Sequence, residues 1–224
     1  MKIGVFSDTH SHHRMIDMES VKQYDMLIFA GDCSNPKDKY INANEVLNFI
    51  EWYESLEVPH KLWIAGNHET SIYFNAVRPK EICKSTTYLY HELVVVAGLR
   101  IFGSPYTPTF GDWAFMKSNE KLHRLWEDIP EGLDILVTHG PPHGVLDLSK
   151  NKDGIIEMCG DKPLLKRVQK VKPLYHIFGH IHNSNGIHNE ATLIRDLTMF
   201  KNVSCVTDGK ISSGLTSFIK TIIR

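Results

Sequence analysis

The sequence has little cysteine, and its cysteines do not occur in close pairs. The four, Cys33, Cys83, Cys159 and Cys205, are widely separated along 224 residues and form no C-x-x-C motif. Their spacing excludes a zinc knuckle and a thioredoxin-like redox motif, and we expect four free, buried thiols. No apolar run reaches the ~20 residues of a membrane-spanning helix, and Asp8 follows a much shorter apolar run than a signal peptide has. We therefore expect a cytoplasmic protein without a membrane partner.

The chain also lacks an excess of charge of either sign. Its 25 Lys and Arg residues stand against 26 Asp and Glu, so no uniformly basic surface is available to hold nucleic acid. We expect no stable nucleic-acid binding. Internal repeats, low-complexity tracts and Ser/Gly linkers are missing as well, which predicts a single domain over residues 1–224.

Short apolar runs that end abruptly in polar residues or glycine recur along the chain and are typical of strands buried on both faces. Five such strands are predicted at residues 3–7, 26–30, 62–65, 135–138 and 175–178. Helices are predicted at residues 44–56, 118–126 and 163–171, and further strands at 88–90, 93–97, 100–102, 192–194, 202–206 and 217–223. The order predicts an α/β fold, a four-layer α/β/β/α sandwich of two mixed β-sheets flanked by helices.

Asp, Asn or His follows each of the five buried strands. Ligands of an α/β sheet bind beyond the carboxyl ends of its strands, so we expect these side chains to converge. Oxygen and imidazole ligands without thiolate suit Mn, Fe, Zn or Mg, and a set larger than four indicates two divalent ions. The set is Asp8, His10, Asp32, Asn67, His68, His139, His180 and His182.

The charge of such a site limits the class of substrate that it can bind. Two carboxylates do not neutralise two divalent ions, so the site keeps positive charge and suits an anionic, tetrahedral phosphoryl group. Metal-bound water has a lowered pKa and supplies the attacking hydroxide at neutral pH. Peptide hydrolysis is disfavoured because the sequence has no H-E-x-x-H motif. Hydrolysis of a phosphoester is the predicted reaction.

The same residues resemble the ordered motifs of the calcineurin-like metallophosphoesterases. The motifs are Asp8-Thr9-His10, Gly31-Asp32, Gly66-Asn67-His68-Glu69, Thr138-His139-Gly140-Pro141-Pro142 and Gly179-His180-Ile181-His182. The resemblance implies one metal bound by Asp8, His10 and His182, and a second bound by Asn67, His139 and His180. It further implies that Asp32 bridges the metals, that a bridging hydroxide attacks phosphorus, and that His68 acts as the general acid. Glu69 is expected in a structural role.

A closer resemblance is to the small metallophosphoesterase-domain proteins related to class III cyclic-nucleotide phosphodiesterases. Residues 103–106 and 112–115 resemble the G-S-P-W and N-W-A-F motifs of that group. The resemblance implies a phosphodiesterase acting on a cyclic nucleotide or another small phosphodiester. Manganese is the expected metal, with Fe, Zn and Mg as alternatives.

Two other functions stay open. One is phosphomonoesterase or protein phosphatase activity at the same site, although the arginines that clamp phosphate in the Ser/Thr phosphatases are missing. The other is a metal-binding interaction scaffold with weak activity, against which the complete ligand set argues. Comparing the hydrolysis rates of a chromogenic diester and its monoester distinguishes the first alternative from a phosphodiesterase. Metal analysis of the purified protein distinguishes the second.

Several residues close to the motifs have open roles. His12, His13 and Arg14 follow the first motif and could reach the substrate, as could His143. Residues 106–115 could cover the core or form a rim on which a nucleobase stacks. The other histidines are expected to be surface or hydrogen-bonded core residues: His60, His91, His123, His176 and His188.

Overall fold

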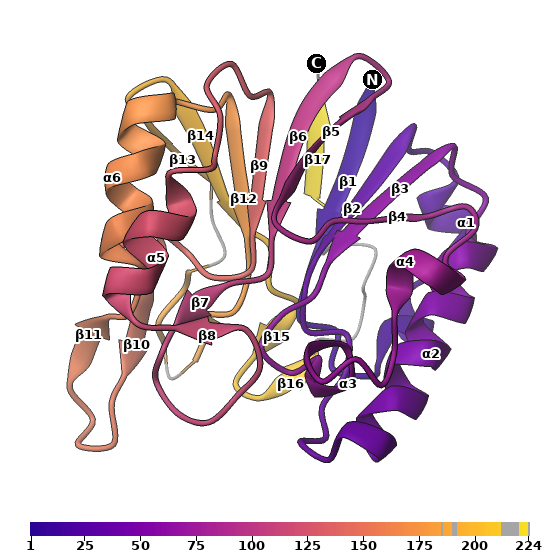
Figure 1. The fold of residues 1–224 in the computed structure, drawn as a ribbon, viewed down its shortest axis with the longest axis horizontal. Helices are drawn as coiled ribbons and strands as arrows, with labels where there is room; N and C mark the ends of the chain where they lie inside the picture. Colours follow the sequence, from indigo (N-terminus) through magenta and orange to yellow (C-terminus); the bar gives the residue numbers. More distant parts are fainter. Residues whose placement is uncertain (185, 190–191, 212–219, 224) are drawn as a thin grey trace.

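The computed structural model describes residues 1–184, 186–189, 192–211 and 220–223. Two β-sheets lie face to face, and helices cover the outer face of each sheet (Figure 1). Each sheet combines parallel and antiparallel strand pairs. The predicted four-layer α/β/β/α sandwich of two mixed sheets is therefore confirmed. The single domain over 1–224 stays a prediction.

The first sheet has parallel strands at its centre. Within the described residues its order is β17-β1-β2-β3-β4, and the C-terminal strand β17 pairs antiparallel with β1 at one edge. Its strands are β1 (Lys2–Phe6), β2 (Met26–Ala30), β3 (His60–Ile64), β4 (Thr87–Tyr88) and β17 (Lys220–Ile223). The predicted strand at 217–223 thus corresponds to β17, while its residues 217–219 lie outside the described residues.

The second sheet has antiparallel pairs at both edges and parallel pairs between them. Its order in the described part of the chain is β13-β14-β12-β9-β6-β5. The strands are β5 (Glu92–Val96), β6 (Leu99–Ser104), β9 (Ile135–Thr138), β12 (Tyr175–Phe178), β13 (Thr192–Arg195) and β14 (Thr198–Asn202). Three short pairs lie outside the two sheets: β7 (Thr107–Pro108) with β8 (Met116–Lys117), β10 (Leu148–Lys150) with β11 (Ile156–Met158), and β15 (Val206–Thr207) with β16 (Lys210–Ile211).

Aspartate carboxylates cap the first turns of two of the three main helices in the described part of the chain. On the first sheet, helix α2 (Lys39–Ser55) begins earlier than the predicted residue 44, because the Asp38 carboxylate accepts hydrogen bonds from the backbone N–H groups of Tyr40 and Ile41. On the second sheet, α5 (Asn119–Trp126) and α6 (Lys162–Val171) match their predicted ranges closely. The short helices are η1 (His13–Met15), α1 (Met18–Val21), α3 (Thr70–Tyr73) and α4 (Pro79–Ile82).

Alternation along each central strand divides the core into a layer between the sheets and layers beneath the helices. In β2, Met26 and Ile28 belong to the apolar cluster that both sheets share. Leu27 and Phe29 belong to the cluster that contains residues of α2, α5 and α6. All five residues of β2 are buried, as the unbroken apolar run predicts.

The predicted strand at 202–206 is wrong. Strand β14 ends at Asn202, and the chain then leaves the second sheet to run beside the end of β1. The N–H of Ser7 donates to the carbonyl of Val203 at 3.1 Å, and the N–H of Cys205 donates to the carbonyl of Ser7 at 3.1 Å. Residues 203–205 are buried because they join the two sheets, and burial alone gave them the pattern of a sheet strand.

The expectation of four buried thiols is half correct. All four cysteines are free, but only Cys33 and Cys205 are buried, whereas Cys83 is half-buried and Cys159 is exposed. Cys159 follows the β10–β11 hairpin, whose strand β11 is exposed throughout. No helix among the described residues combines the length and the apolar character needed to cross a membrane.

His176 on β12 is a core histidine whose protonation is coupled to folding. It is fully buried, its Nε2–H donates to Thr138 Oγ1 at 2.8 Å, and its Nδ1 has no hydrogen-bond partner. Burial lowers its pKa from 6.5 to about 3. As the pH falls below 6.5, the unfolded chain therefore binds a proton that the folded protein does not, and stability is lost.

This coupling predicts an acid-dependent loss of stability that depends on His176. Between pH 7 and pH 5 we expect the unfolding free energy of His176→Leu to fall by about 2 kcal/mol less than that of the wild type. Urea unfolding of the metal-free protein at the two pH values measures the effect. The exposed His123→Leu variant is the control, and an equal loss in wild type and His176→Leu would contradict the prediction.

Candidate metal centre

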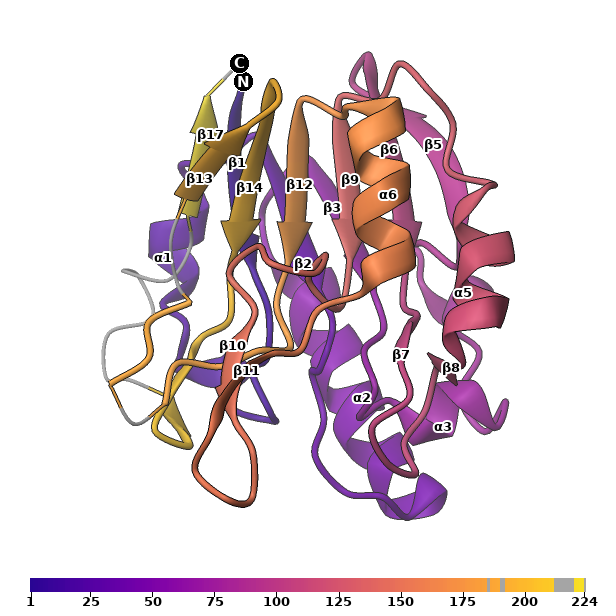
Figure 2. The ribbon, with the colours of Figure 1, turned by 90° about the vertical axis from the view of Figure 1, so that its left-hand side faces the viewer.

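The predicted site residues converge where parallel strands of both sheets end. Figure 2 shows β12 and β14 ending toward the same edge, from which the connecting loops extend. Backbone hydrogen bonds join these loops: the N–H of Asp8 donates to the carbonyl of Gly31 at 2.9 Å, and the N–H of Gly179 donates to that of His139 at 2.9 Å. Segments far apart in the sequence are thus held against one another.

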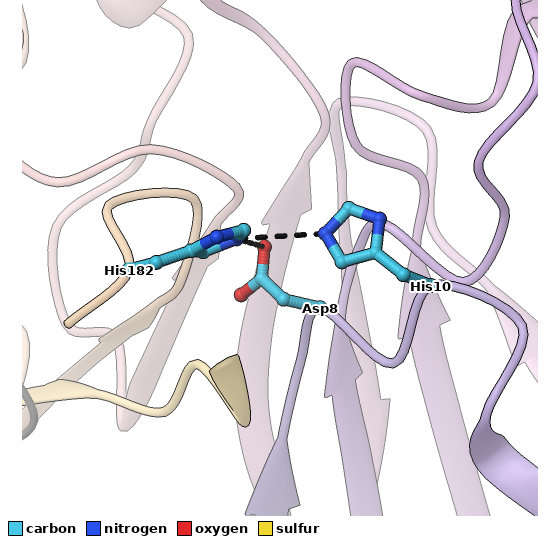
Figure 3. Close-up of side chains that lie close together, drawn as sticks. All are labelled: Asp8, His10 and His182. Carbon is cyan, nitrogen blue, oxygen red and sulfur yellow. Dashed lines mark hydrogen bonds and ion pairs between the residues drawn. The ribbon is translucent and has the colours of Figure 1, made fainter. Parts of the chain in front are cut away.

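One group of possible metal ligands joins the loops after β1 and β12. Asp8, His10 and His182 each offer one ligand atom, and the three atoms lie within 4.8 Å of one another. Figure 3 shows the two imidazoles on either side of the Asp8 carboxylate. His182 Nε2 lies 3.3 Å from Asp8 Oδ1 and 3.5 Å from His10 Nε2. Asp8 is fully buried, whereas both histidines are half-buried and open toward solvent.

A second group lies beside the first and includes Asp32, His139 and His180. His139 Nε2 lies 3.2 Å from Asp32 Oδ2 and 3.0 Å from Asn67 Oδ1. Asp32 also belongs to a third group with His10 and His68, so its carboxylate is shared between clusters. His180 and His182, although only two residues apart in the sequence, belong to different groups of possible ligands.

Left-handed backbone conformations aim several of these side chains. Outside glycine, positive φ is uncommon and costs energy, and it is frequent at functional sites. The φ values are 58° at Asp8, 41° at His10, 61° at Asp32 and 67° at His180. Because the strands have ended before these positions, the side chains leave the strand alternation and turn toward a common point.

Glu69 holds the loops of this edge together. Its buried carboxylate accepts hydrogen bonds from the N–H groups of Asp32 at 2.9 Å, Ser34 at 3.0 Å and Gly66 at 2.6 Å. It also accepts one from the Ser34 hydroxyl at 2.8 Å. Glu69 thereby fixes the segments that carry Asp32 and Asn67, in agreement with the structural role expected for it.

The arrangement of nitrogen and oxygen atoms fits a bound cation. His139 Nδ1 lies 2.8 Å from the carbonyl oxygen of Ala30, which only accepts, so Nδ1 carries the hydrogen. In the neutral ring the lone pair of Nε2 then faces the oxygens of Asp32 and Asn67. A proton or a metal ion among these atoms removes the repulsion. His10 repeats the pattern, with Nδ1 3.3 Å from the Ser34 carbonyl oxygen and Nε2 facing His182.

The carboxylates of Asp8 and Asp32 are both ionised, as ligands of a cation must be. Burial opposes ionisation of Asp8, but the hydrogen bond with His182 and its charge lower the pKa of Asp8 to about 2. Burial also opposes ionisation of Asp32, yet the charge of His139 holds its pKa well below the usual range. In return, and against the effect of burial, Asp32 raises the pKa of His139 to about 9. A cation that replaces this proton would preserve the same favourable charge pairing.

A cavity of about 580 Å³ opens beside the first group. Its volume falls in the range of small-molecule sites. Its lining residues are His10, His12, Met15, Asn35, His68, His182, Val206, Gly209 and Lys210. The part of the cavity formed by the β15–β16 hairpin could not be predicted from the sequence, because the hairpin follows the last motif and carries no recognisable signal of its own.

Of the three residues that follow the first motif, only His12 lines this cavity. His12 is exposed and lines the cavity. His13 is buried, its Nε2–H donates to Asn48 Oδ1 at 3.0 Å, and its ring packs on Trp52, so it does not reach the cavity. Arg14 forms an exposed ion pair with Glu51 at 3.3 Å. The suggestion that His13 or Arg14 contacts substrate is therefore not supported, since the turn at η1 directs both toward α2.

His143 and the aromatic segment 106–115 also had open roles, and neither lines the cavity. His143 is half-buried, with Nδ1 3.8 Å from Asp147 Oδ2, and does not line the cavity. Part of the segment 106–115 covers the core, since Phe115 is buried there, while Phe110 is exposed and lies beside His180 with the ring centroids 5.2 Å apart. Trp113 lies against His68.

Sequence comparison agrees with this geometry. A profile of the family described as calcineurin-like phosphoesterase matches residues 1–184. The chain belongs to the calcineurin-like phosphoesterases. Metallophosphoesterase domain-containing protein 1 of Homo sapiens is 36% identical over 226 residues, an alignment that covers 90% of this chain and 65% of that protein. UPF0046 protein C25E10.12 of Caenorhabditis elegans is 34% identical, with 84% of this chain and 72% of that protein covered. The chain thus spans less than two thirds of the human relative.

Solved structures show the same fold at low identity. One superposes with a TM-score of 0.69 at 12% identity, covering 91% of this chain and 90% of the other. Phosphopantetheinyl hydrolase from Mycobacterium tuberculosis superposes with a TM-score of 0.50 at 15% identity, covering 93% and 90%. These structures show the fold, and the match of the family profile shows the family.

Proposed function

We propose that this chain is a phosphodiesterase that requires two divalent metal ions and hydrolyses a small phosphodiester, with cyclic nucleotides as the first candidates. The observation that carries the proposal is that two clusters of nitrogen and oxygen ligands, Asp8/His10/His182 and Asp32/His139/His180, lie side by side, with Asp32 also grouped with His10 and His68. The family match supports metal-dependent phosphoester hydrolysis. The cavity of about 580 Å³ beside the clusters has room for a substrate of nucleotide size.

The two clusters suggest which residues hold each metal. One ion would be bound by Asp8, His10 and His182, which lie within 4.8 Å of one another. The other would be bound by Asn67, His139 and His180, and Asp32 would contact both. When bound, the ions supply positive charge for the phosphoryl oxygens and lower the pKa of the attacking water. Nitrogen and oxygen ligands suit manganese, and also iron, zinc or magnesium.

Two side chains of the cavity are placed to act on the substrate, one by donating a proton and one by binding with its charge. His68 Nδ1 donates to the Asn35 carbonyl oxygen at 3.1 Å, so Nε2 is the nitrogen that faces Asp32, at 4.0 Å from Oδ2. His68 also lines the cavity, with its side chain 18% exposed. It is therefore placed to give a proton from Nε2 to the departing alcohol oxygen. Lys210 lines the same cavity and offers a cation to another part of the substrate.

The preference for a diester rests on the charge of the cavity wall. A dianionic monoester gains from a bidentate arginine, and arginine is absent from the cavity lining in the described part of the chain. The apolar side chains of Met15 and Val206 suit the second substituent of a diester. Phosphomonoesterase activity is the second candidate, favoured by the cation of Lys210.

A substrate panel run beside metal analysis tests the proposal. We expect the purified protein to bind close to two metal ions per chain and to hydrolyse bis-(p-nitrophenyl) phosphate with manganese faster than p-nitrophenyl phosphate. Chelation should abolish the activity and added manganese should restore it. Cyclic and linear nucleotides assayed under the same conditions identify the substrate class. A strong monoester preference would reverse the assignment, and a protein that stays inert with each of the four metals would point to the interaction scaffold.

A further inference from the structure

Trp113 packs directly on the proposed general acid. The ring centroids of Trp113 and His68 are 4.3 Å apart and their planes are inclined by 36°. A second ring, that of His10, meets His68 edge-on with the centroids 4.8 Å apart. His68 thus lies in contact with a candidate metal ligand and with an indole to which the proposed reaction gives no role.

The indole is held by its own segment of chain. The N–H of Ala114 donates to the carbonyl of Asn67 at 3.0 Å, so the backbone beside Trp113 is tied to the backbone beside His68. Phe115 follows with a φ of 55° and is buried, and its carbonyl accepts a hydrogen bond from the N–H of Thr107 at 3.1 Å. The Lys37 ammonium lies 4.3 Å from the indole centroid, a cation–π contact that further restrains the ring.

His68 requires such a contact because hydrogen bonds alone do not fix its ring. A single bond, from Nδ1 to the Asn35 carbonyl oxygen at 3.1 Å, orients the imidazole. One hydrogen bond restrains χ1 and χ2 of His68 only partly, so some rotation of the ring remains, and the side chain is 18% exposed. Packing on Trp113 limits this rotation, so Nε2 is kept toward the Asp32 side of the cavity, where the leaving group would lie.

We propose that Trp113 is a positioning residue that fixes the imidazole of His68 for proton donation to the leaving group. The inference rests on the proposed function, because it needs His68 to act as the acid. Loss of the indole lets the ring turn away from the leaving group, while the metal ligands stay in place. The effect should increase as the leaving group becomes a poorer one, since p-nitrophenolate departs with little help from an acid.

A double-mutant cycle tests this role. Wild type, Trp113→Ala, His68→Ala and the double variant are assayed with methyl aryl phosphodiesters whose leaving groups range from p-nitrophenol to phenol. For the phenyl ester we expect Trp113→Ala to lower kcat about tenfold or more, with little change in KM and in metal content. In the His68→Ala background the same substitution should change kcat by less than about twofold.

Two further variants separate positioning from folding. Trp113→Phe keeps an aromatic face against His68 and should restore most of the activity with the phenyl ester. Tyr40→Ala removes an exposed aromatic side chain on α2 and should leave the dependence on the leaving group unchanged. Thermal unfolding and metal analysis of each variant identify any loss that comes from a damaged fold.

The possible results are distinguishable. If His68→Ala leaves the dependence on the leaving group unchanged, the acid role in the proposed function is wrong and the inference fails with it. If His68→Ala steepens the dependence but Trp113→Ala does not, only the inference is overturned. An effect of Trp113→Ala on KM that persists in the His68→Ala background also overturns it, because the indole would then contact the substrate directly. A wild-type protein inactive on every diester refutes both proposals.

Discussion

Asp32→Asn is expected to lower kcat/KM for a phosphodiester by about a thousandfold or more, equivalent to about 4 kcal/mol of transition-state stabilisation, and to remove bound metal. The carboxylate belongs to two of the three clusters of possible ligands. Asparagine has nearly the same size and keeps one oxygen, so the hydrogen bond that Asp32 Oδ1 accepts from the His68 N–H at 2.9 Å can be retained. What is lost is a buried negative charge that, in the proposed centre, would contact both metal ions.

Metal content and activity should fall together in this variant, and both are measured on the same preparation. Metal analysis after dialysis gives the occupancy, and titration with manganese shows whether activity returns at a higher concentration. Asp153→Asn, in an exposed turn of the β10–β11 hairpin, is the matched control for loss of one carboxylate. Full occupancy and full activity in Asp32→Asn would exclude Asp32 as the residue shared by the two metals.

The strand ends explain why so much of this edge could be predicted from the sequence. Residues 26–30, 135–138 and 175–178 were predicted as strands, and β2, β9 and β12 have these bounds. A strand buried on both faces needs an unbroken apolar run, so the first polar residue marks where the strand ends. In parallel strands these ends meet at one edge, which brings Asp32, His139 and His180 together.

The conformation of the loops could not be predicted in the same way. Nothing in the sequence around Asp8 or His10 indicates a left-handed backbone, because these residues are not glycine and adopt it only under constraint from neighbouring loops. The backbone partners of the site were also hidden. The carbonyl oxygens of Ala30 and Ser34 orient His139 and His10, and a carbonyl group carries no signal in a side-chain pattern.

The start of α2 and the contact between Trp113 and His68 were not predicted from the sequence, one for a local reason and one because the two residues are far apart in the chain. Asp38 caps the helix through a local contact, whereas the apolar spacing from which the helix was predicted begins farther on, at residue 44. Trp113 and His68, in contrast, lie 45 positions apart, and their segments are joined by the hydrogen bond from the Ala114 N–H to the Asn67 carbonyl at 3.0 Å. Residues 112–115 were noticed as a motif, but pattern alone gave the indole no partner.

Gly179→Ala is expected to disrupt the proposed metal centre although every proposed ligand is retained. A Cβ placed on Gly179 would overlap the Asp8 carboxylate and the Ser7 hydroxyl and would lie 2.9 Å from Ser7 Cβ. Asp8 cannot move aside easily, because it is fully buried and its two carboxylate oxygens accept the N–H of His180 at 3.1 Å each. The methyl group must therefore displace either the carboxylate or the loop that carries His180 and His182.

We expect this displacement to weaken metal binding by at least about a hundredfold, since a ligand shifted by about 1 Å no longer has suitable geometry. Gly132→Ala is the control, because Gly132 has a φ of 72° with nothing within 4 Å of the added Cβ. Alanine there adds backbone strain of about 1 kcal/mol but touches no part of the site. Isothermal titration with manganese and thermal unfolding, carried out on both variants, separate the two effects. Loss of stability in both variants with loss of metal binding only in Gly179→Ala would show that the glycine is required for the space it leaves to Asp8. Equal manganese affinity in both would contradict the proposed place of Asp8 among the ligands.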